Sequence, residues 1–179
     1  MDDIGVFEAI YNQRQFTRYK PDPVPREAIE KIIDAATKAP SGGNKQPWHF
    51  LAVTEKDLVE KIGGLYRELW LGAMGATPPP GESPAYTSAR YLANHMPEVP
   101  AMLIICADHT MGSVPYSKGE PIERGRYAAS LWLAVQNLFL AAQALGLGTR
   151  ITTTHIPVSY THLRAHETLR YLVCRLLLE

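Results

Sequence analysis

Residues 39–48, Ala-Pro-Ser-Gly-Gly-Asn-Lys-Gln-Pro-Trp, gather the residue types that can bind a flat heteroaromatic ring. Ser41, Asn44 and Gln46 offer a hydroxyl and two amides, which both donate and accept hydrogen bonds. The two glycines between them permit unusual backbone conformations and let a ligand approach the main chain closely. Pro40 should end the preceding helix, because the residue before a proline is pushed out of the helical region. An ordinary helix-to-strand turn is the alternative, since Gly, Ser and Asn are common turn residues.

A second group of polar residues lies nearer the start of the chain. Arg14 and Arg18 are four residues apart, so they could share one side of a turn. Two guanidinium groups suit a phosphate, which they bind with planar, bidentate donors. Thr17 adds a hydroxyl beside them. A pair of solvated arginines explains the same spacing, and the residues alone leave both alternatives open.

The stretch 40–48 resembles the Pro-Ser-Gly-Gly-Asn-x-Gln-Pro-Trp signature of the nitroreductase family, whose members are flavoenzymes that use FMN. Residues 11–25 are similar to the Arg-rich opening of that family and its proline-rich lead into the second helix. Residues 136–138 and 144–149 resemble its central helix and the following turn. The resemblance runs from about residue 4 to about residue 156. The family has more arginine, and often a serine, where this chain has Gln15 and Thr17.

The resemblance implies two groups of FMN-binding residues. The phosphate and ribityl end would be held by four residues near the start of the chain: Arg14, Gln15, Thr17 and Arg18. The isoalloxazine ring would meet residues of the turn and backbone near residues 148–154: Pro40, Ser41, Asn44, Gln46 and Thr153. The flavin carries the chemistry in such proteins. No side chain is therefore expected to act as a catalytic acid or base.

The implied function is FMN-dependent oxidation of NADH or NADPH by a ping-pong cycle. Hydride would pass from the nicotinamide to the flavin, and a small electron-poor acceptor such as a nitroaromatic or a quinone would then be reduced. The resemblance also implies a homodimer with FMN at its interface, a two-fold pairing being the commonest assembly. Two alternatives remain open. One is a related FMN enzyme that carries out dehalogenation or dehydrogenation, and the other is a flavin-binding protein without turnover.

Composition excludes several other classes of protein. The 179 residues carry a formal net charge of zero, which gives no electrostatic footprint for nucleic acid or an anionic membrane. No apolar run reaches transmembrane length and no signal peptide is apparent, so a cytoplasmic protein is expected. The two cysteines have no metal or disulfide spacing. His162 and His166 have helical metal-ligand spacing but no third ligand nearby, so no metal site is expected.

Hydrophobic periodicity predicts the elements that position these residues. Helices are expected over residues 4–13, 26–38, 57–71 and 127–145, and strands over residues 49–53, 101–107 and 149–154. Strand 101–107 is apolar enough to be central, and helix 127–145 is apolar nearly all round, as in a buried or interface helix. With the resemblance, the expected class is an α+β fold with a central mixed, mainly antiparallel sheet flanked by helices, incomplete at the C-terminus.

The segment 72–97 breaks the helical pattern and contains the run Thr-Pro-Pro-Pro-Gly-Glu-Ser-Pro. Long irregular segments are often lids or binding loops. Four aromatic residues in or before it could stack on a substrate ring or simply attach a surface loop: Tyr66, Trp70, Tyr86 and Tyr91. Neither alternative is favoured by the sequence.

The C-terminal 22 residues differ in character from the rest of the chain. Residues 159–168 resemble translated sequencing-adapter sequence rather than part of an evolved domain, and such segments are excluded from fold reasoning. We therefore expect a partial nitroreductase-like FMN-binding domain over residues 1–157 and a non-native tail over residues 158–179. Family members continue instead with a further helix, a strand and an arm that reaches the partner subunit.

Overall fold

The computed structural model describes residues 4–107, 123–152 and 173–178. Within these ranges the chain forms five α-helices, two short 3₁₀ helices and four strands. The helices and strands follow one another in this order: α1 (Val6–Asn12), α2 (Arg26–Thr37), η1 (Gly42–Asn44), β1 (Trp48–Val53), α3 (Lys56–Met74), α4 (Pro84–His95), η2 (Met96–Glu98), β2 (Met102–Ala107), α5 (Glu123–Ala144), β3 (Leu147–Thr152) and β4 (Val173–Leu178).

The four strands form one sheet in the order β1-β2-β4-β3, and every pair of neighbours is antiparallel. In β1 and β2, Trp48 lies opposite Ala107 and Val53 lies opposite Met102. The expected α+β class is confirmed. The expected sheet was mixed. In the described residues its parallel pairing amounts to one isolated bridge, between Gln15 and Thr149.

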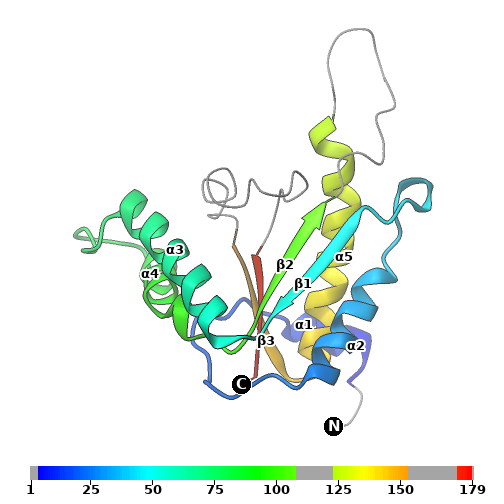
Figure 1. Cartoon of the computed structure of the whole chain (residues 1–179), viewed down its shortest axis with the longest axis horizontal. Helices are drawn as coiled ribbons and strands as arrows, with labels where there is room; N and C mark the ends of the chain where they lie inside the picture. The colour runs from blue at the N-terminus through cyan, green and yellow to red at the C-terminus, as the bar shows by residue number, and fades with distance from the viewer. Residues whose placement is uncertain (1–3, 108–122, 153–172, 179) are drawn as a thin grey trace, which may run out of the picture.

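Helices cover both faces of the sheet, with α2 and α5 on one side and α3 and α4 on the other (Figure 1). Strand β2 lies between β1 and β4 and alternates between the two sides. Leu103 and Ile105 belong to the core cluster under α2 and α5, whereas Met102 belongs to the cluster under α3. The prediction that residues 101–107 form a central strand buried on both faces is confirmed.

The helical predictions for residues 26–38 and 127–145 are also confirmed. Ile29, Ile32 and Ala36 of α2 are buried against α5, as the periodicity indicates. Helix α5 ends at Ala144, and Gly146 follows with a φ of 70°, a left-handed conformation that suits glycine after a helix. This turn sends the chain back along the sheet as β3.

The segment 72–97, predicted to be irregular, is partly helical, which corrects the prediction from the sequence. Residues 84–95 form α4, whose first turn contains Pro84 and is capped by the Ser83 hydroxyl, which accepts a hydrogen bond from the Tyr86 amide at 3.5 Å. The irregular part is therefore only residues 75–83. Tyr66 and Trp70 are buried in the α3 core rather than free to stack on a substrate.

Helix α1 is where the sequence predicted a helix, but its apolar residues are exposed. Only Ala9 of α1 is buried. Four large apolar side chains are open to solvent in the single chain: Val6, Phe7, Ile10 and Tyr11. Such a contiguous apolar surface is typical of an interaction site.

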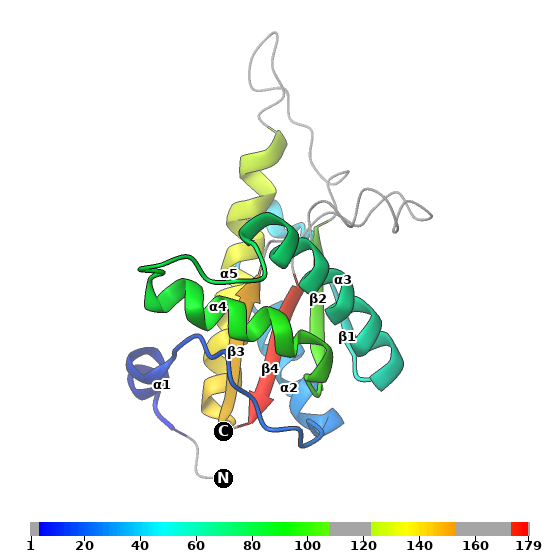
Figure 2. The same ribbon diagram turned by 90° about the vertical axis from the view of Figure 1, so that its left-hand side faces the viewer.

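Strand β4 lies between β2 and β3 (Figure 2). It belongs to the range 158–179 that the sequence identifies as a non-native tail, and its backbone pairs with both neighbours. The boundary at residue 157 remains a prediction. Thr153, His162 and His166 lie outside the described residues.

Candidate functional site

The turn between α2 and β1 has a strained backbone. Gly43, Asn44 and Gln46 have φ values of 61°, 52° and 48°. The left-handed region is uncommon for residues other than glycine, although Asn enters it more readily than most. Two such non-glycine residues within three positions cost of order 1–3 kcal/mol each, and this kind of strain is concentrated at functional sites. The turn therefore has the backbone expected of a binding loop.

Hydrogen bonds within the turn hold this conformation. The Ser41 hydroxyl accepts from the Gln46 amide at 2.9 Å, and the Ser41 carbonyl accepts from the Asn44 amide at 2.9 Å. The Gln46 carbonyl accepts from the Trp48 amide at 2.8 Å, at the start of β1. Ser41 thus closes the turn through both its side chain and its main chain.

Two neighbours fix the turn to the core. Trp48 is 7% exposed and packs in the cluster between α2, α5 and the sheet. On the other side, the Gly42 amide donates to the hydroxyl of Ser130 in α5 at 3.3 Å. Ser130 is itself buried. Ser130 was not predicted as part of the site. A polar residue in an otherwise apolar helix could have indicated it, since buried polar groups need partners.

The amide side chains of the turn face solvent. Asn44 and Gln46 are exposed, and the Gln46 Nε2 donates to Asn44 Oδ1 at 3.5 Å. That bond uses one donor of one amide and one acceptor position of the other. The remaining amide groups can meet the polar edge of a flat ligand.

The segment that contains Arg14 and Arg18, residues 14–18, lies against β3 and α4 and is called the arginine segment below. The Phe16 amide donates to the Thr149 carbonyl at 3.0 Å, next to the bridge between Gln15 and Thr149. The Thr17 hydroxyl lies 2.7 Å from the Ser88 hydroxyl of α4. Residues 15–17 are therefore attached to two elements that follow them by more than 70 positions in the sequence.

The two arginines point to different partners. Arg14 Nη1 donates to the carbonyls of Tyr11 and Gln13 at 2.7 and 2.8 Å, at the end of α1. Arg18 stacks over the ring of Tyr91, with its Cζ 4.1 Å from the ring centroid. Both residues are exposed. The structure shows each guanidinium near the surface, and it does not show the two converging on one point.

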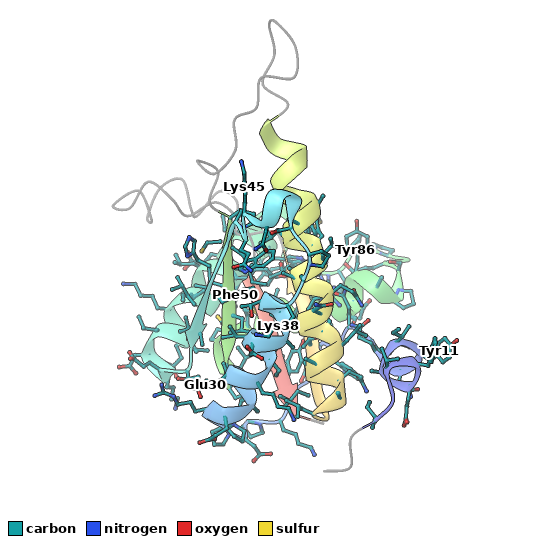
Figure 3. All side chains as sticks on the ribbon, turned by 90° about the vertical axis from the view of Figure 1, so that its right-hand side faces the viewer. Tyr11, Glu30, Lys38, Lys45, Phe50 and Tyr86 are labelled. Atoms are coloured by element: carbon teal, nitrogen blue, oxygen red, sulfur yellow. The ribbon has the colours of Figure 1, made fainter. Side chains whose placement is uncertain are left out.

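The turn and α1, which leads into the arginine segment, lie at different places around α5. In Figure 3, Lys45 of the turn is the uppermost labelled residue and Tyr11 of α1 lies at the right. The turn contacts α5 at Ser130, whereas the arginine segment contacts β3 and α4.

A buried ion pair attaches the loop 75–83 to α4. Arg90 binds both carboxylate oxygens of Glu82, one of them at 3.4 Å, and also donates to the Gly75 carbonyl. Its guanidinium lies 5.2 Å from the centroid of the Trp70 ring. The Arg90 hydrogen bond lowers the pKa of the Glu82 carboxyl, so Glu82 stays charged at neutral pH. The loop is thereby held against both α3 and α4.

Other kinds of site find no support in the described residues. No group of three His, Cys, Asp or Glu side chains is placed to hold a metal ion in the part of the chain that the structure describes. No helix in that part combines the length and hydrophobicity of a membrane span. Cys106 is buried, and burial raises the pKa of its thiol to about 11, which leaves it protonated at neutral pH.

A helix-covered antiparallel sheet with a strained polar turn after its second helix defines an α+β domain. The nitroreductase family profile matches residues 13–165, so this chain belongs to the nitroreductase family. The resemblance stated from the residues 40–48 is confirmed by this match.

Relatives agree with this assignment. The chain is 31% identical over 145 residues to a protein of Methanothermobacter thermautotrophicus whose name gives it as a candidate NADH dehydrogenase/NAD(P)H nitroreductase. That alignment covers 81% of this chain and 59% of the relative, so the chain spans about 60% of the relative's length. Iodotyrosine deiodinase of Danio rerio is 36% identical over 63 residues, 35% of this chain and 21% of its own length.

The fold is shared with a solved structure of iodotyrosine deiodinase bound to FMN and 3-iodo-L-tyrosine. The TM-score is 0.74 at 22% identity, over 97% of this chain and 89% of that chain. FMN is thus bound by a protein of this fold.

Proposed function

We propose that this chain is an FMN-dependent NAD(P)H oxidoreductase that reduces nitroaromatic, quinone or similar electron-poor acceptors by a ping-pong cycle. The observation that carries the proposal is the turn at residues 40–48. Its left-handed Asn44 and Gln46 and its closing Ser41 build a rigid polar edge from the residues of the family signature.

The donor set of the chain fits FMN at both ends of that cofactor. The exposed amides of Asn44 and Gln46 can donate to and accept from the ring edge, beside Pro40 and Ser41. Arg14 and Arg18 are cationic, exposed and suited to a phosphate. When bound, FMN would supply the hydride-transfer chemistry, and these residues would hold and orient it.

The same geometry supports a homodimer with FMN at its interface. In one chain the turn contacts α5 at Ser130 and the arginine segment contacts β3 and α4, and a second chain could bring the two sets of residues to one cofactor. Exposed apolar residues flank both regions. Phe7 and Tyr11 of α1 are each 68% exposed, and Trp132 and Leu133 of α5 are 44% and 48% exposed. A two-fold partner would remove these side chains from water.

Reductive dehalogenation of an aromatic substrate is the second candidate. It is favoured by the 36% identity to the deiodinase of Danio rerio over 63 residues. Tyr86, which is 51% exposed on α4 next to the loop 75–83, is the aromatic residue available for stacking on a substrate ring. Both candidate functions use the same cofactor site and differ in the acceptor.

Anaerobic reduction tests the proposal. The protein is saturated with FMN, free flavin is removed, and the absorbance of retained flavin is followed as NADH or NADPH is added. We expect bleaching by one or both nucleotides and recovery of the colour with a nitroaromatic or quinone. Release of iodide from 3-iodotyrosine, with no reaction of nitroaromatics or quinones, would favour the second candidate. Retained flavin that no nucleotide bleaches would contradict the proposed activity.

Matched asparagine variants connect the result to the turn. Asn44→Ala should lower flavin retention, because its amide lies on the turn. Asn94→Ala should not, because the Asn94 amide donates within α4 to the Arg90 carbonyl at 3.0 Å. Equal retention in both variants would move the cofactor site away from the turn.

A further inference from the structure

Helix α4 supports the two residues at the end of the arginine segment. Ser88 lies 2.7 Å from the Thr17 hydroxyl, and the Tyr91 ring lies 4.1 Å from the guanidinium carbon of Arg18. Ser88 and Tyr91 are three positions apart, so they share one face of α4. Two consecutive residues of the segment therefore rest on two neighbouring side chains of one helix.

The stack on Tyr91 leaves the binding edges of Arg18 available. A guanidinium above an aromatic ring is attracted through its flat face. Its N–H groups lie in the guanidinium plane and point outward, in the fork that suits a phosphate. Because the stack confines the side chain of Arg18, less conformational freedom is lost when an anion binds.

The hydrogen bond between the Thr17 and Ser88 hydroxyls also leaves a group free to bind an anion. A hydroxyl carries one donor and two acceptor positions. When Ser88 donates to Thr17, the Thr17 proton is left to donate to an anion. Ser88 is partly buried on α4, where its hydroxyl lies next to that of Thr17.

The Tyr91 ring is itself held in place. The His95 ring stacks on it with a centroid distance of 4.2 Å and an interplanar angle of 29°. The His95 ring and the Arg18 guanidinium both contact the Tyr91 ring. His95 Nδ1 is 2.9 Å from Glu98 Oε2, which attaches His95 to the 3₁₀ helix that follows α4.

We propose that Ser88 and Tyr91 are positioning residues that pre-organise Thr17 and Arg18 to bind the phosphate group of FMN. This inference rests on the proposed function. It adds two residues of α4 to the site, and neither touches the reacting ring.

The test compares the dissociation constants of FMN and riboflavin, which lacks the phosphate, measured by quenching of flavin fluorescence. Tyr91→Leu should raise the FMN dissociation constant about two- to fivefold and leave that of riboflavin unchanged. Ser88→Ala should act in the same direction, and Tyr91→Phe, which keeps the ring, should match the wild type. Asn94→Ala is the control, because Asn94 lies on the same helix and its amide donates to the Arg90 carbonyl at 3.0 Å rather than to the arginine segment.

A double-mutant cycle separates positioning from general stability. Arg18→Gln should raise the FMN dissociation constant about tenfold or more. Tyr91→Leu should then add nothing in the Arg18→Gln background. An equal loss of FMN and riboflavin binding in Tyr91→Leu, or full additivity in the cycle, would overturn the inference.

The outcomes also distinguish this inference from the proposed function. A wild-type protein that binds riboflavin as tightly as FMN would have no phosphate site here, which would overturn the inference and leave the flavin assignment standing. A wild-type protein that binds neither would overturn the proposed function, and the inference with it.

Discussion

The two segments expected to meet FMN are built in different ways. The conformation of the turn at residues 40–48 is set mainly by hydrogen bonds between residues at most five positions apart, and one further bond, from the Gly42 amide to Ser130, attaches it to α5. The segment at residues 14–18 has contacts with α4 and β3, which are distant in sequence. The ring end of the site is therefore shaped locally, and the phosphate end depends on tertiary structure.

This difference predicts how each end responds to mutation. Changes within the turn should affect the ring end directly, so FMN and riboflavin should be affected alike. Changes in α4 or the arginine segment should affect only the ligand that carries a phosphate.

The largest effect is expected from Trp48→Ala. Trp48 is 7% exposed and anchors the turn in the core, so its removal should lower the free energy of unfolding by about 3–5 kcal/mol. Trp132→Ala is the matched control, because Trp132 is 44% exposed and should cost far less in the single chain. Urea unfolding of both variants at low protein concentration checks the prediction. Equal losses would mean that the turn is not anchored through Trp48.

Arg14→Ala tests the phosphate end. Loss of a hydrogen bond to a charged group costs roughly 1.5–3 kcal/mol, so the FMN dissociation constant should rise about tenfold or more. Riboflavin binding should stay unchanged. Arg26→Ala is a suitable control, since Arg26 is exposed and pairs with Glu30 on α2 at 2.7 Å. A similar loss for riboflavin would remove Arg14 from the phosphate site.

Asn44 separates side-chain chemistry from backbone strain in the turn. Asn44→Gly keeps the left-handed φ of 52° at no steric cost and removes the amide, whereas Asn44→Ala removes the amide and adds about 1–2 kcal/mol of backbone strain. Both variants should weaken FMN and riboflavin binding, and only Asn44→Ala should also lower stability. Calorimetric titration and thermal unfolding give the two readouts. Unweakened flavin binding in Asn44→Gly would show that the amide is not part of the site.

The smallest effect is expected from the ion pair that fixes α4. Arg90 lowers the pKa of Glu82 in the folded chain. A lowered folded pKa contributes stability above the unfolded pKa, about 4.3 for Glu, and that stability is lost as pH falls through the folded value. Wild type should therefore exceed Glu82→Gln in stability at pH 7, and the difference should shrink in acid. Unfolding of both proteins between neutral and acid pH measures it, and a difference that does not change with pH would contradict the assignment.

Local signals explain which features could be predicted from sequence. Pro40 predicts the turn because it ends the preceding helix, and the two glycines predict it because they permit unusual backbone conformations. Apolar residues predict α2, α5 and β2. The positive φ of Gln46 could not be anticipated, because Gln has no preference for that conformation and the contacts of the turn impose it.

The support from α4 could not be predicted for a different reason. Its residues are mostly Ser, Thr, Tyr, Asn and Ala, a composition with a weak helical signal, and the helix is fastened by Arg90 to a loop. Thr17 and Ser88 are 71 positions apart, so nothing in the sequence connects them. The exposure of the apolar side of α1 follows from how α1 packs on α5, which a helical period does not specify.

Sedimentation velocity followed at the absorbance of flavin tests the central claim, an FMN site shared between two copies of this chain. The protein is mixed with FMN and the moving flavin signal is recorded. The proposed shared site predicts that flavin sediments with a species of twice the mass of one chain. Flavin that sediments with a single chain would contradict the shared site, and flavin that stays free would contradict the cofactor assignment.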